Sequence, residues 1–382
     1  MAVIKLDSGY NIGVPPESCT LKEHPVPVPA KQTEVVQDKS LPILAIVSTG
    51  GTIASRIDYR TGSVTSQFNA NDILTAIPEL KEIANYRTVP LATILSENMT
   101  PSIWLDLARA VHAEIKDGAK GVIVTHGTDT MAYSAAALSF MIDTPAPIIF
   151  VGSQRSADRP SSDNAMNAVC AAAAATSDLG EVAVVMHSST NDDTCTIHRG
   201  TRVRKMHTSR RDAFRSLGIT PIGEVEYPSR KVTLAKNAVR RGTRTLALHD
   251  RLEPHCALVQ FYPGMTPGLL KAYEGYHGLV IAGTGLGHTS TTLIPQLKHL
   301  ADSGTLIVMP SQCMHGRVCD RVYDTGRDLL AAGVIEGGDM LPEVALVKLM
   351  WVLGNKKDKK KAAALMQDEL KGECSRRSPH GL

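Results

Sequence analysis

The stretch Leu41–Thr52, with the sequence LPILAIVSTGGT, shows the pattern that decides the fold: an aliphatic run that ends abruptly in Ser, Thr and Gly. Short aliphatic runs without polar alternation are typical of strands that are buried on both faces, and such strands form parallel sheets. The sequence therefore predicts a parallel strand here and in each later copy of the pattern. These copies are GVIV before THGTDT (125–130), APIIFV before GSQRS (152–156), EVAVVM before HSSTND (187–192), GLVIA before GTGLGHTS (283–290) and GTLIVM before PSQC (310–313).

Helical patterns separate these predicted strands. Alternating strands and helices indicate a doubly wound α/β fold, in which ligands bind outside the carboxyl ends of the strands. Because every Ser/Thr/Gly cluster follows a strand, we expect the clusters to share one crevice. The predicted helices cover 103–115, 131–142, 164–176 and 343–352, and Ser161, Ser162 and Asp163 are candidate N-caps of the third helix.

Composition shifts along the chain predict two domains and an N-terminal extension. Residues 41–228 are expected to form a larger domain with a doubly wound parallel sheet, 229–254 a basic linker, and 255–382 a smaller α/β domain with a helical tail. Residues 1–40 begin with VIKLDSGYNIGV, which is interpreted as one strand, and continue as a Pro-rich linker. A single strand without pairing partners is expected to be poorly ordered. The lysine run at 356–361 is interpreted as a solvated helix end.

The overall composition is that of a globular protein. The chain has 382 residues, of which 43% are hydrophobic, and its 41 basic and 38 acidic side chains give a net charge of +3. Such a balanced charge does not predict nucleic-acid binding. Seven cysteines without short spacing predict reduced thiols and a cytoplasmic protein. No apolar run approaches the ~20 residues of a membrane helix, and the first residues lack the apolar region of a signal peptide.

Two of the Ser/Thr/Gly clusters carry groups that are suited to nucleophilic chemistry. TGGT (Thr49–Thr52) places hydroxyls after a strand, and HGTDT (His126–Thr130) places the Thr128 hydroxyl beside the Asp129 carboxylate. A hydroxyl needs a base or charge stabilisation to become a nucleophile, and Lys205 in RVRKMHTSRRDAF is a candidate base. The same residues can be explained without catalysis. The hydroxyls would then cap helices after turns, and Lys205 would be a surface lysine among arginines 202, 204, 210 and 211.

Metal and nucleotide sites are less well supported by the sequence. Cys313, His315 and Cys319 lie close together, but their spacing is not that of a zinc site and no second half is present. GTGLGH (Gly283–His288) resembles a dinucleotide turn, but it has histidine where the third glycine belongs. A phosphate-binding GxxxxGK[ST] loop is absent from the sequence. Metal coordination, NAD binding and ATP hydrolysis by this chain are therefore not predicted.

From about Leu41 onward, the order of these blocks resembles the L-asparaginase family. The resemblance rests on TGGTIAS, SENM (Ser96–Met99), THGTDTM, the segment GSQR…SSDNAMNA, Lys205 followed by basic residues and DAF, and GTGLGH. It implies a larger doubly wound domain followed by a smaller α/β domain, without a metal or organic cofactor. It also implies a homodimer with active sites at the interface, and hydrolysis of a side-chain amide through a threonine acyl-enzyme.

The resemblance also implies roles for individual residues. Thr52 would be the first catalytic threonine, and Tyr59 would lie on a flap over the site. Thr128, Asp129 and Lys205 would form the second catalytic set. Ser96 and Asp129 would hold the α-carboxylate and α-amino groups of the substrate, while Glu97 departs from the glutamine that secreted bacterial members usually carry there. The sequence leaves open which threonine forms the acyl-enzyme, and whether glutamine or asparagine is preferred.

Within the family, the chain is most similar to the branch formed by the D subunits of archaeal glutamyl-tRNA(Gln) amidotransferases. VIKLDSGYNIG, SENMTPSIW, MHTSRRDAFRS and the segment from PSQC to AGVI carry this likeness. It implies a glutaminase that supplies ammonia to the E subunit of the amidotransferase, which uses ATP and Mg²⁺ on Glu-tRNA(Gln), and it makes residues 1–40 a remnant of a β-rich domain plus linker. The alternatives are a free cytosolic L-asparaginase and a non-catalytic nucleotide-binding module built on TGGT and GTGLG.

Overall fold

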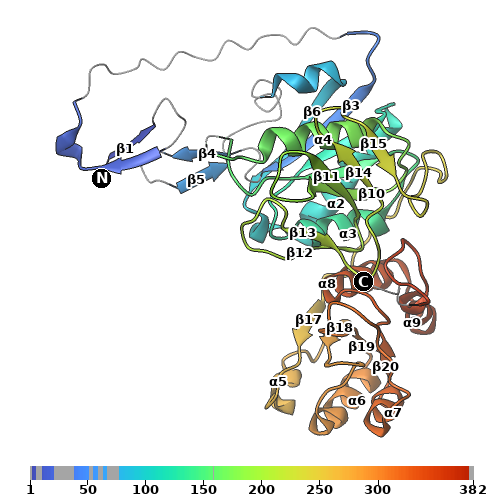
Figure 1. The fold of residues 1–382 in the computed structure, drawn as a ribbon. Coiled ribbons are helices and arrows are strands. Elements are labelled where there is room, and N and C mark those ends of the chain that lie inside the picture. Colours follow the sequence, from blue (N-terminus) through green and yellow to red (C-terminus); the bar gives the residue numbers. More distant parts are fainter. Residues whose placement is uncertain are drawn as a thin grey trace.

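The computed structural model describes residues 2–5, 11–20, 38–50, 55–58, 63–66, 77–157 and 159–377. Two α/β units lie one above the other in Figure 1, and the N-terminal strands project to one side of the upper unit. The upper unit is built on an eight-stranded sheet and the lower unit on a four-stranded sheet. This arrangement confirms the predicted fold class of a larger α/β domain followed by a smaller one.

The large sheet has the strand order β15-β14-β11-β10-β9-β7-β3-β6. Its parallel part contains β6, β3, β7, β9 and β10. The strands span β3 (Ile43–Gly50), β6 (Asn85–Ile94), β7 (Gly121–Thr125), β9 (Ile148–Val151), β10 (Val182–His187), β11 (Thr194–Arg199), β14 (Gly223–Glu226) and β15 (Val232–Leu234). The predicted aliphatic runs therefore form neighbouring strands.

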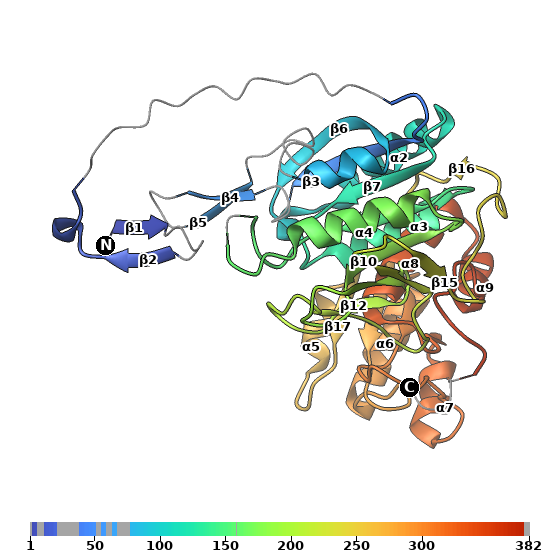
Figure 2. The same ribbon diagram turned by 45° about the horizontal axis from the view of Figure 1, so that its top comes forward.

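Both faces of this sheet are covered by helices (Figure 2). Alternate side chains of β3 belong to different core clusters: Ala45 and Val47 pack with α2 (Pro101–Lys116) and α3 (Met131–Met141), whereas Leu44 and Ile46 pack with α4 (Asn164–Thr176). This double burial explains why the strand has no polar alternation. All three predicted helices of the domain are present, with ends within two residues of their expected positions.

The large sheet is parallel where the predicted strands lie and antiparallel at one edge, so it is a mixed sheet. Strands β11, β14 and β15 are antiparallel to their neighbours. Only residues 188–193 connect β10 to β11, and a parallel crossover needs a dozen or more residues. The chain therefore has to turn back beside β10. Residues 229–254, expected as a linker, contribute β15 to this sheet and β16 (Ala247–Leu248), which pairs with β8 (Ile142–Asp143).

The small domain has four parallel strands in the order β17-β18-β19-β20. They are β17 (Cys256–Gln260), β18 (Gly278–Ala282), β19 (Leu306–Met309) and β20 (Val334–Glu336), with helices α5 (Pro267–Lys271), α6 (Ile294–Asp302) and α7 (Asp324–Ala331). Helix α8 (Pro342–Asn355) packs against both α3 and β18. Because one core cluster includes α2, α3, β18 and α8, the two domains share apolar packing.

The last segment of the described chain ties the domains together. After α9 (Lys359–Gln367), the buried Glu373 carboxylate lies 2.6 Å from the buried Lys348 ammonium of α8. The backbone carbonyls of Lys371 and Gly372 accept hydrogen bonds from Thr201 and Arg202 of the large domain. The lysine run lies at the start of α9, where its side chains are exposed, as expected for a solvated helix end.

Besides the pair of β8 with β16, the described residues form three short strand pairs outside the two main sheets. Strand β1 (Ala2–Lys5) pairs antiparallel with β2 (Asn11–Val14), so the interpretation of residues 3–14 as one unpaired strand is wrong. Strand β4 (Ser55–Asp58) pairs with β5 (Ser63–Ser66). The third pair, β12 (Val203–Lys205) with β13 (Phe214–Ser216), carries a residue of the candidate site. The 3₁₀ helices are η1 (Pro16–Ser18), η3 (Pro78–Glu82), η4 (Ser96–Asn98) and η5 (Thr291–Leu293).

All seven cysteines lie among the described residues and are free thiols, as predicted. Over the same part of the chain, no helix has the length and apolarity that a bilayer crossing requires.

Candidate active site

The candidate site begins where β3 and β7 end side by side. Ser48 is paired with Thr125 across the two parallel strands, and the Thr49 hydroxyl donates a 2.9 Å hydrogen bond to the Thr125 carbonyl. Gly50 follows with φ of +103°, a conformation that favours glycine. The loop after β7 and the first two residues of the TGGT block therefore meet at one edge of the sheet. Thr52 and Tyr59 lie outside the described residues.

Lys205 reaches this edge from a distant part of the chain. Its Nζ atom lies 2.8 Å from the Thr128 hydroxyl oxygen and 2.8 Å from Asp129 Oδ1. The Lys205 side chain is only 12% exposed, whereas the Asp129 side chain is 70% exposed. Thr128 is also buried. The structure thus brings together three of the predicted residues, and Lys205 is not the surface lysine of the non-catalytic interpretation.

The four arginines near Lys205 in sequence have acidic partners of their own. The guanidinium of Arg202 is buried and bonds the Asp339 side chain and the Gly372 carbonyl, which anchors the residue immediately before β12. Arg204 lies 3.5 Å from a carboxylate oxygen of α8. The complete set of pairs is Arg202–Asp339, Arg204–Glu343, Arg210–Asp212 and Arg211–Asp192.

A buried chain of hydrogen bonds fixes the loop that carries Thr128. Trp104 Nε1–H donates to Ser134 Oγ at 2.8 Å, and Ser134 Oγ lies 2.7 Å from His126 Nε2. The Gly127 carbonyl can only accept, so His126 Nδ1 carries the proton, and Nε2 of the neutral ring accepts from the Ser134 hydroxyl. His126 Nδ1–H then donates to the Gly127 carbonyl at 2.7 Å. Burial lowers the pKa of His126 to about 4, which keeps the imidazole neutral, as this direction of bonding requires. We call these four residues the Trp104 relay.

Ser96 packs against the same loop. A Cβ atom on Gly127 would lie 2.6 Å from Ser96 Cβ, so only glycine fits beside this serine. The Thr130 hydroxyl donates to the Ser96 carbonyl at 2.7 Å. Ser96 is buried, and the next residue, Glu97, is exposed. The structure therefore places Ser96 directly against the loop of Thr128 and Asp129, with an exposed carboxylate next to it in sequence.

A second buried network holds the loop after β9. The Asp163 carboxylate, which sequence reasoning assigned as an N-cap, accepts hydrogen bonds from the backbone N–H groups of Gln154 and Arg155 and from Asn167 Nδ2. Asn167 Nδ2 also donates to the Gly152 carbonyl. At Gly152, a Cβ atom would meet the Thr128 methyl group at 3.0 Å. This network therefore shapes the wall behind Thr128.

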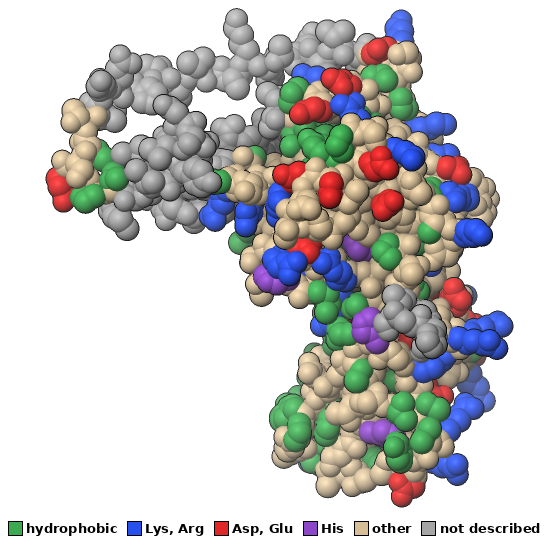
Figure 3. Space-filling view, viewed as in Figure 1, with side chains coloured by type: hydrophobic (Ala, Val, Ile, Leu, Met, Phe, Trp, Pro, Cys, Tyr) green, Lys and Arg blue, Asp and Glu red, His purple; other side chains and the backbone are tan. Residues whose placement is uncertain are grey.

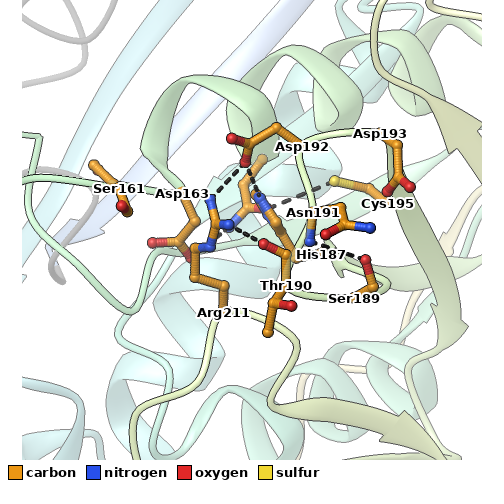
Figure 4. Close-up of polar contacts among 12 residues, drawn as sticks. Ser161, Asp163, His187, Ser189, Thr190, Asn191, Asp192, Asp193, Cys195 and Arg211 are labelled. Carbon is orange, nitrogen blue, oxygen red and sulfur yellow. Dashed lines mark hydrogen bonds and ion pairs between the residues drawn. The ribbon is translucent and has the colours of Figure 1, made fainter.

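The same network continues into the connection between β10 and β11 (Figure 4). His187 Nδ1 lies 2.6 Å from Asn167 Oδ1, and His187 Nε2 lies 3.2 Å from Asp192 Oδ1. Arg211 donates to the same Asp192 oxygen and to the Thr190 carbonyl. Burial lowers the pKa of His187. These contacts tie the short β10–β11 connection to the segment six residues after Lys205.

The arrangement has the groups that acyl transfer requires. A threonine hydroxyl lies within hydrogen-bond distance of an amine that can take its proton once the amine is deprotonated. Among the described residues only Oδ1 of the exposed Asp129 carboxylate has a partner, so Oδ2 can accept from a cationic group of a ligand. Sequence reasoning identified Thr128, Asp129, Lys205 and Ser96, and it singled out the HGTDT block that contains His126 and Gly127. It missed Trp104 and Ser134, which have no motif of their own.

Comparisons with known proteins agree with this geometry. Residues 43–240 match the family described as "Asparaginase, N-terminal", and residues 255–366 match "Glutaminase/Asparaginase C-terminal domain". Among curated relatives, the D subunit of glutamyl-tRNA(Gln) amidotransferase from Methanosarcina barkeri is 55% identical over 98% of this chain and 92% of its own length. The protein of the same name from Archaeoglobus fulgidus is 57% identical over 92% of this chain and 84% of its own length.

Solved structures show the same fold. The thermostable L-asparaginase from Thermococcus kodakarensis superposes with a TM-score of 0.79 and 32% identity, over 87% of this chain and 99% of that one. L-asparaginase I from Vibrio cholerae gives a TM-score of 0.75 and 28% identity, over 88% of this chain and 99% of that one.

Proposed function

Because the chain belongs to the asparaginase family, we propose that it hydrolyses glutamine as the amidase component of a tRNA-dependent amidotransferase. The predicted family resemblance is confirmed by both domain matches, and the likeness to the archaeal D subunits by identities of 55–57% over nearly the whole chain. The contact between Lys205 Nζ and the Thr128 hydroxyl carries the proposal. It supplies the nucleophile and base pair that a hydrolytic component needs.

The proposed reaction proceeds through an ester of a threonine. In its amine form, Lys205 takes the proton of the Thr128 hydroxyl, and the oxygen attacks the carbon of the substrate carboxamide. The C–N bond then breaks, ammonia leaves with the transferred proton, and water hydrolyses the ester to release glutamate. Thr52 is the other candidate nucleophile, and Thr128 with Lys205 would then activate the attacking water. Backbone N–H groups of the turns would stabilise the oxyanion.

The charged end of the substrate is proposed to bind at the loop after β7 and at Ser96, which packs against that loop. Asp129 is proposed to bind the α-ammonium group, and Ser96 the α-carboxylate, since one is an exposed carboxylate and the other a hydroxyl packed on the same loop. Glu97 adds a second carboxylate that is exposed beside Ser96. Tyr59 is proposed to cover the site as part of a flap, which would exclude water while the acyl-enzyme forms.

The assembly follows from the same proposal. Two copies of this chain would pair through the asparaginase-like domains, and the E subunit of the amidotransferase would receive the ammonia. ATP and Mg²⁺ would act on that second protein with tRNA(Gln) bound, so this chain needs no cofactor of its own. We place the complex in the cytoplasm, in keeping with the free thiols.

A free L-asparaginase is the second candidate. The likeness to solved L-asparaginases over 99% of their length favours it. The two functions differ in what the isolated chain does. A free asparaginase turns over asparagine rapidly without a partner, whereas the amidotransferase component converts Glu-tRNA(Gln) to Gln-tRNA(Gln) only when the E subunit is present.

The proposed function is tested by reconstitution. The purified chain and the E subunit, incubated with ATP, Mg²⁺, glutamine and Glu-tRNA(Gln), are expected to yield Gln-tRNA(Gln). Thr128→Ala and Lys205→Ala are each expected to abolish the product, because nucleophile and base act as a unit. Lys231→Ala, which changes a 68%-exposed lysine, is the matched control and should retain activity. Absence of product, together with rapid asparagine hydrolysis by the chain alone, would overturn the proposal in favour of the free enzyme.

A further inference from the structure

The register of the small sheet places two histidines side by side, far along the chain from Lys205. Strands β17 and β18 are parallel and pair Cys256 with Gly278 as their first residues. His255 and His277 each stand one position earlier, and the His277 N–H donates to the His255 carbonyl at 2.9 Å. The backbone therefore holds both side chains at the amino-terminal edge of this sheet.

Glu253 completes the cluster from the chain that enters the small domain. Its backbone N–H donates to the Met350 carbonyl of α8 at 2.8 Å, and its Oε1 atom accepts from the His255 backbone N–H at 2.9 Å. The Glu253 side chain is 22% exposed, so its position is set by packing and hydrogen bonds. The two imidazoles are 69% and 60% exposed and lie over it.

The three side chains already present ligand atoms at metal-binding separations. Glu253 Oε1 lies 3.3 Å from His255 Nδ1, and Glu253 Oε2 lies 2.9 Å from His277 Nδ1. All the ligand atoms lie within 4.8 Å of one another. Bonds of about 2.0–2.1 Å to a tetrahedral Zn²⁺ ion put ligand atoms about 3.3–3.4 Å apart. The contact between Glu253 and His255 matches this separation, and the contact between Glu253 and His277 is shorter.

We propose that Glu253, His255 and His277 bind a divalent transition-metal ion of the Zn²⁺ type, with water in the fourth position. Imidazole nitrogen and carboxylate oxygen are ligands that Zn²⁺ accepts. In the described part of the chain, no other group of three His, Cys, Asp or Glu side chains meets the same distance criterion, and Cys313, His315 and Cys319 do not. The ion would join the entry to the small domain to β18, and so stabilise the folded state.

Lysines oppose cation binding at this edge and limit its strength. Lys356, Lys357 and Lys359 line a cavity of about 540 Å³ together with Glu253 and His277. Basic side chains also gather on the surface over α9 (Figure 3). Their charge weakens the attraction of the site for a dication.

The test uses the full-length chain after treatment with a chelator. Calorimetric titration with ZnCl₂ is expected to show one saturable equivalent per chain, and the melting temperature is expected to rise as that equivalent fills. Co²⁺ added instead is expected to give the visible absorption bands of a tetrahedral site. His255→Gln and His277→Gln should each weaken binding at least about tenfold. His299→Gln is the matched control, because His299 is 59% exposed and paired with a glutamate in the same domain.

Three results would overturn the proposal. One is the absence of a saturable equivalent, which would leave the cluster as ion pairs only. Another is unchanged affinity in the double variant of His255 and His277. The third is loss of binding in Cys313→Ser, since Cys313 is an exposed thiol and would then be the ligand. Glutamine hydrolysis measured in parallel is expected to be unchanged in the histidine variants, so failure here is distinguishable from failure of the proposed function.

Discussion

Replacement of Ser134 by alanine tests whether the Trp104 relay positions the catalytic loop. Ser134 is fully buried on α3 and accepts from Trp104 while it donates to His126. Removal of the hydroxyl leaves the indole N–H and His126 Nε2 without their partner. His126 then loses the bond that orients its ring, and its hold on the Gly127 carbonyl, one residue before Thr128, is weakened.

The magnitude follows from the two groups left unsatisfied. A buried donor or acceptor that loses its partner costs about 1–3 kcal/mol. For the two groups, Ser134→Ala is therefore expected to lower the free energy of unfolding by about 2–6 kcal/mol. A displacement of Thr128 relative to Lys205 should lower kcat by roughly tenfold to a hundredfold. Trp104→Phe removes the donor alone, and the bond from Ser134 to His126 survives, so its kcat should stay close to that of the wild type.

Urea denaturation measures the free energy of unfolding, and steady-state glutamine hydrolysis measures kcat. Both assays start from folded protein at matched concentration. Ser139→Ala is the control, since Ser139 lies buried on the same helix but donates only to the carbonyl of Ala135 one turn earlier. That carbonyl keeps its helical hydrogen bond, so the control should lose less than about 1 kcal/mol. If Ser134→Ala lost no more stability than this control and kept the wild-type kcat, the relay would have no positioning role.

Three further perturbations follow from buried groups. Lys348→Met leaves the Glu373 carboxylate buried without its cationic partner, and should lower the free energy of unfolding in urea by about 3–5 kcal/mol. Adding Glu373→Gln should recover part of this loss. Equal losses in the single and double variants would contradict the prediction. Gly127→Ala brings a Cβ atom against the Ser96 side chain, and should lower the free energy of unfolding by about 1–3 kcal/mol and reduce activity. A melting curve identical to that of the wild type would show that the loop can move to accommodate the Cβ atom. Burial lowers the pKa of His198 to about 3. Below the ordinary histidine pKa of about 6.5, the unfolded chain therefore binds one proton that the folded chain does not bind. The free energy of unfolding should fall as pH drops from about 6.5 toward 3. His198→Asn should flatten this slope by about one proton in denaturation at several pH values, and an unchanged slope would contradict the assignment.

Much of the candidate site was predictable because its loops are local in sequence. THGTDT follows a strand whose aliphatic run is unmistakable, and the rule for the carboxyl ends of parallel strands brings it beside the end of β3. The roles of Thr52 and Tyr59 stay predictions. The antiparallel return of β11 was also within reach of the sequence, since six residues between β10 and β11 are too few for a crossover.

Other features of the molecule depend on distant contacts that no local pattern encodes. Trp104 and Ser134 look like ordinary core residues of helices, and only packing of α2 on α3 joins them to His126. Glu253, His255 and His277 form a cluster only because parallel pairing aligns β17 with β18. The long separation in sequence between the two histidines gives no hint of this alignment.

By itself, the amino-acid sequence determined where the buried parallel strands and the helices packed on the large sheet lie, which turns carry hydroxyls and carboxylates, and which family the chain resembles, because periodicity and motifs are properties of neighbouring residues. Tertiary structure alone decided that Lys205, which stands in an arginine-rich segment, is buried against Thr128 with its arginine neighbours paired elsewhere. The reason is physical: a charge can be withdrawn from water only where folding supplies partners, and those partners lie more than seventy residues away.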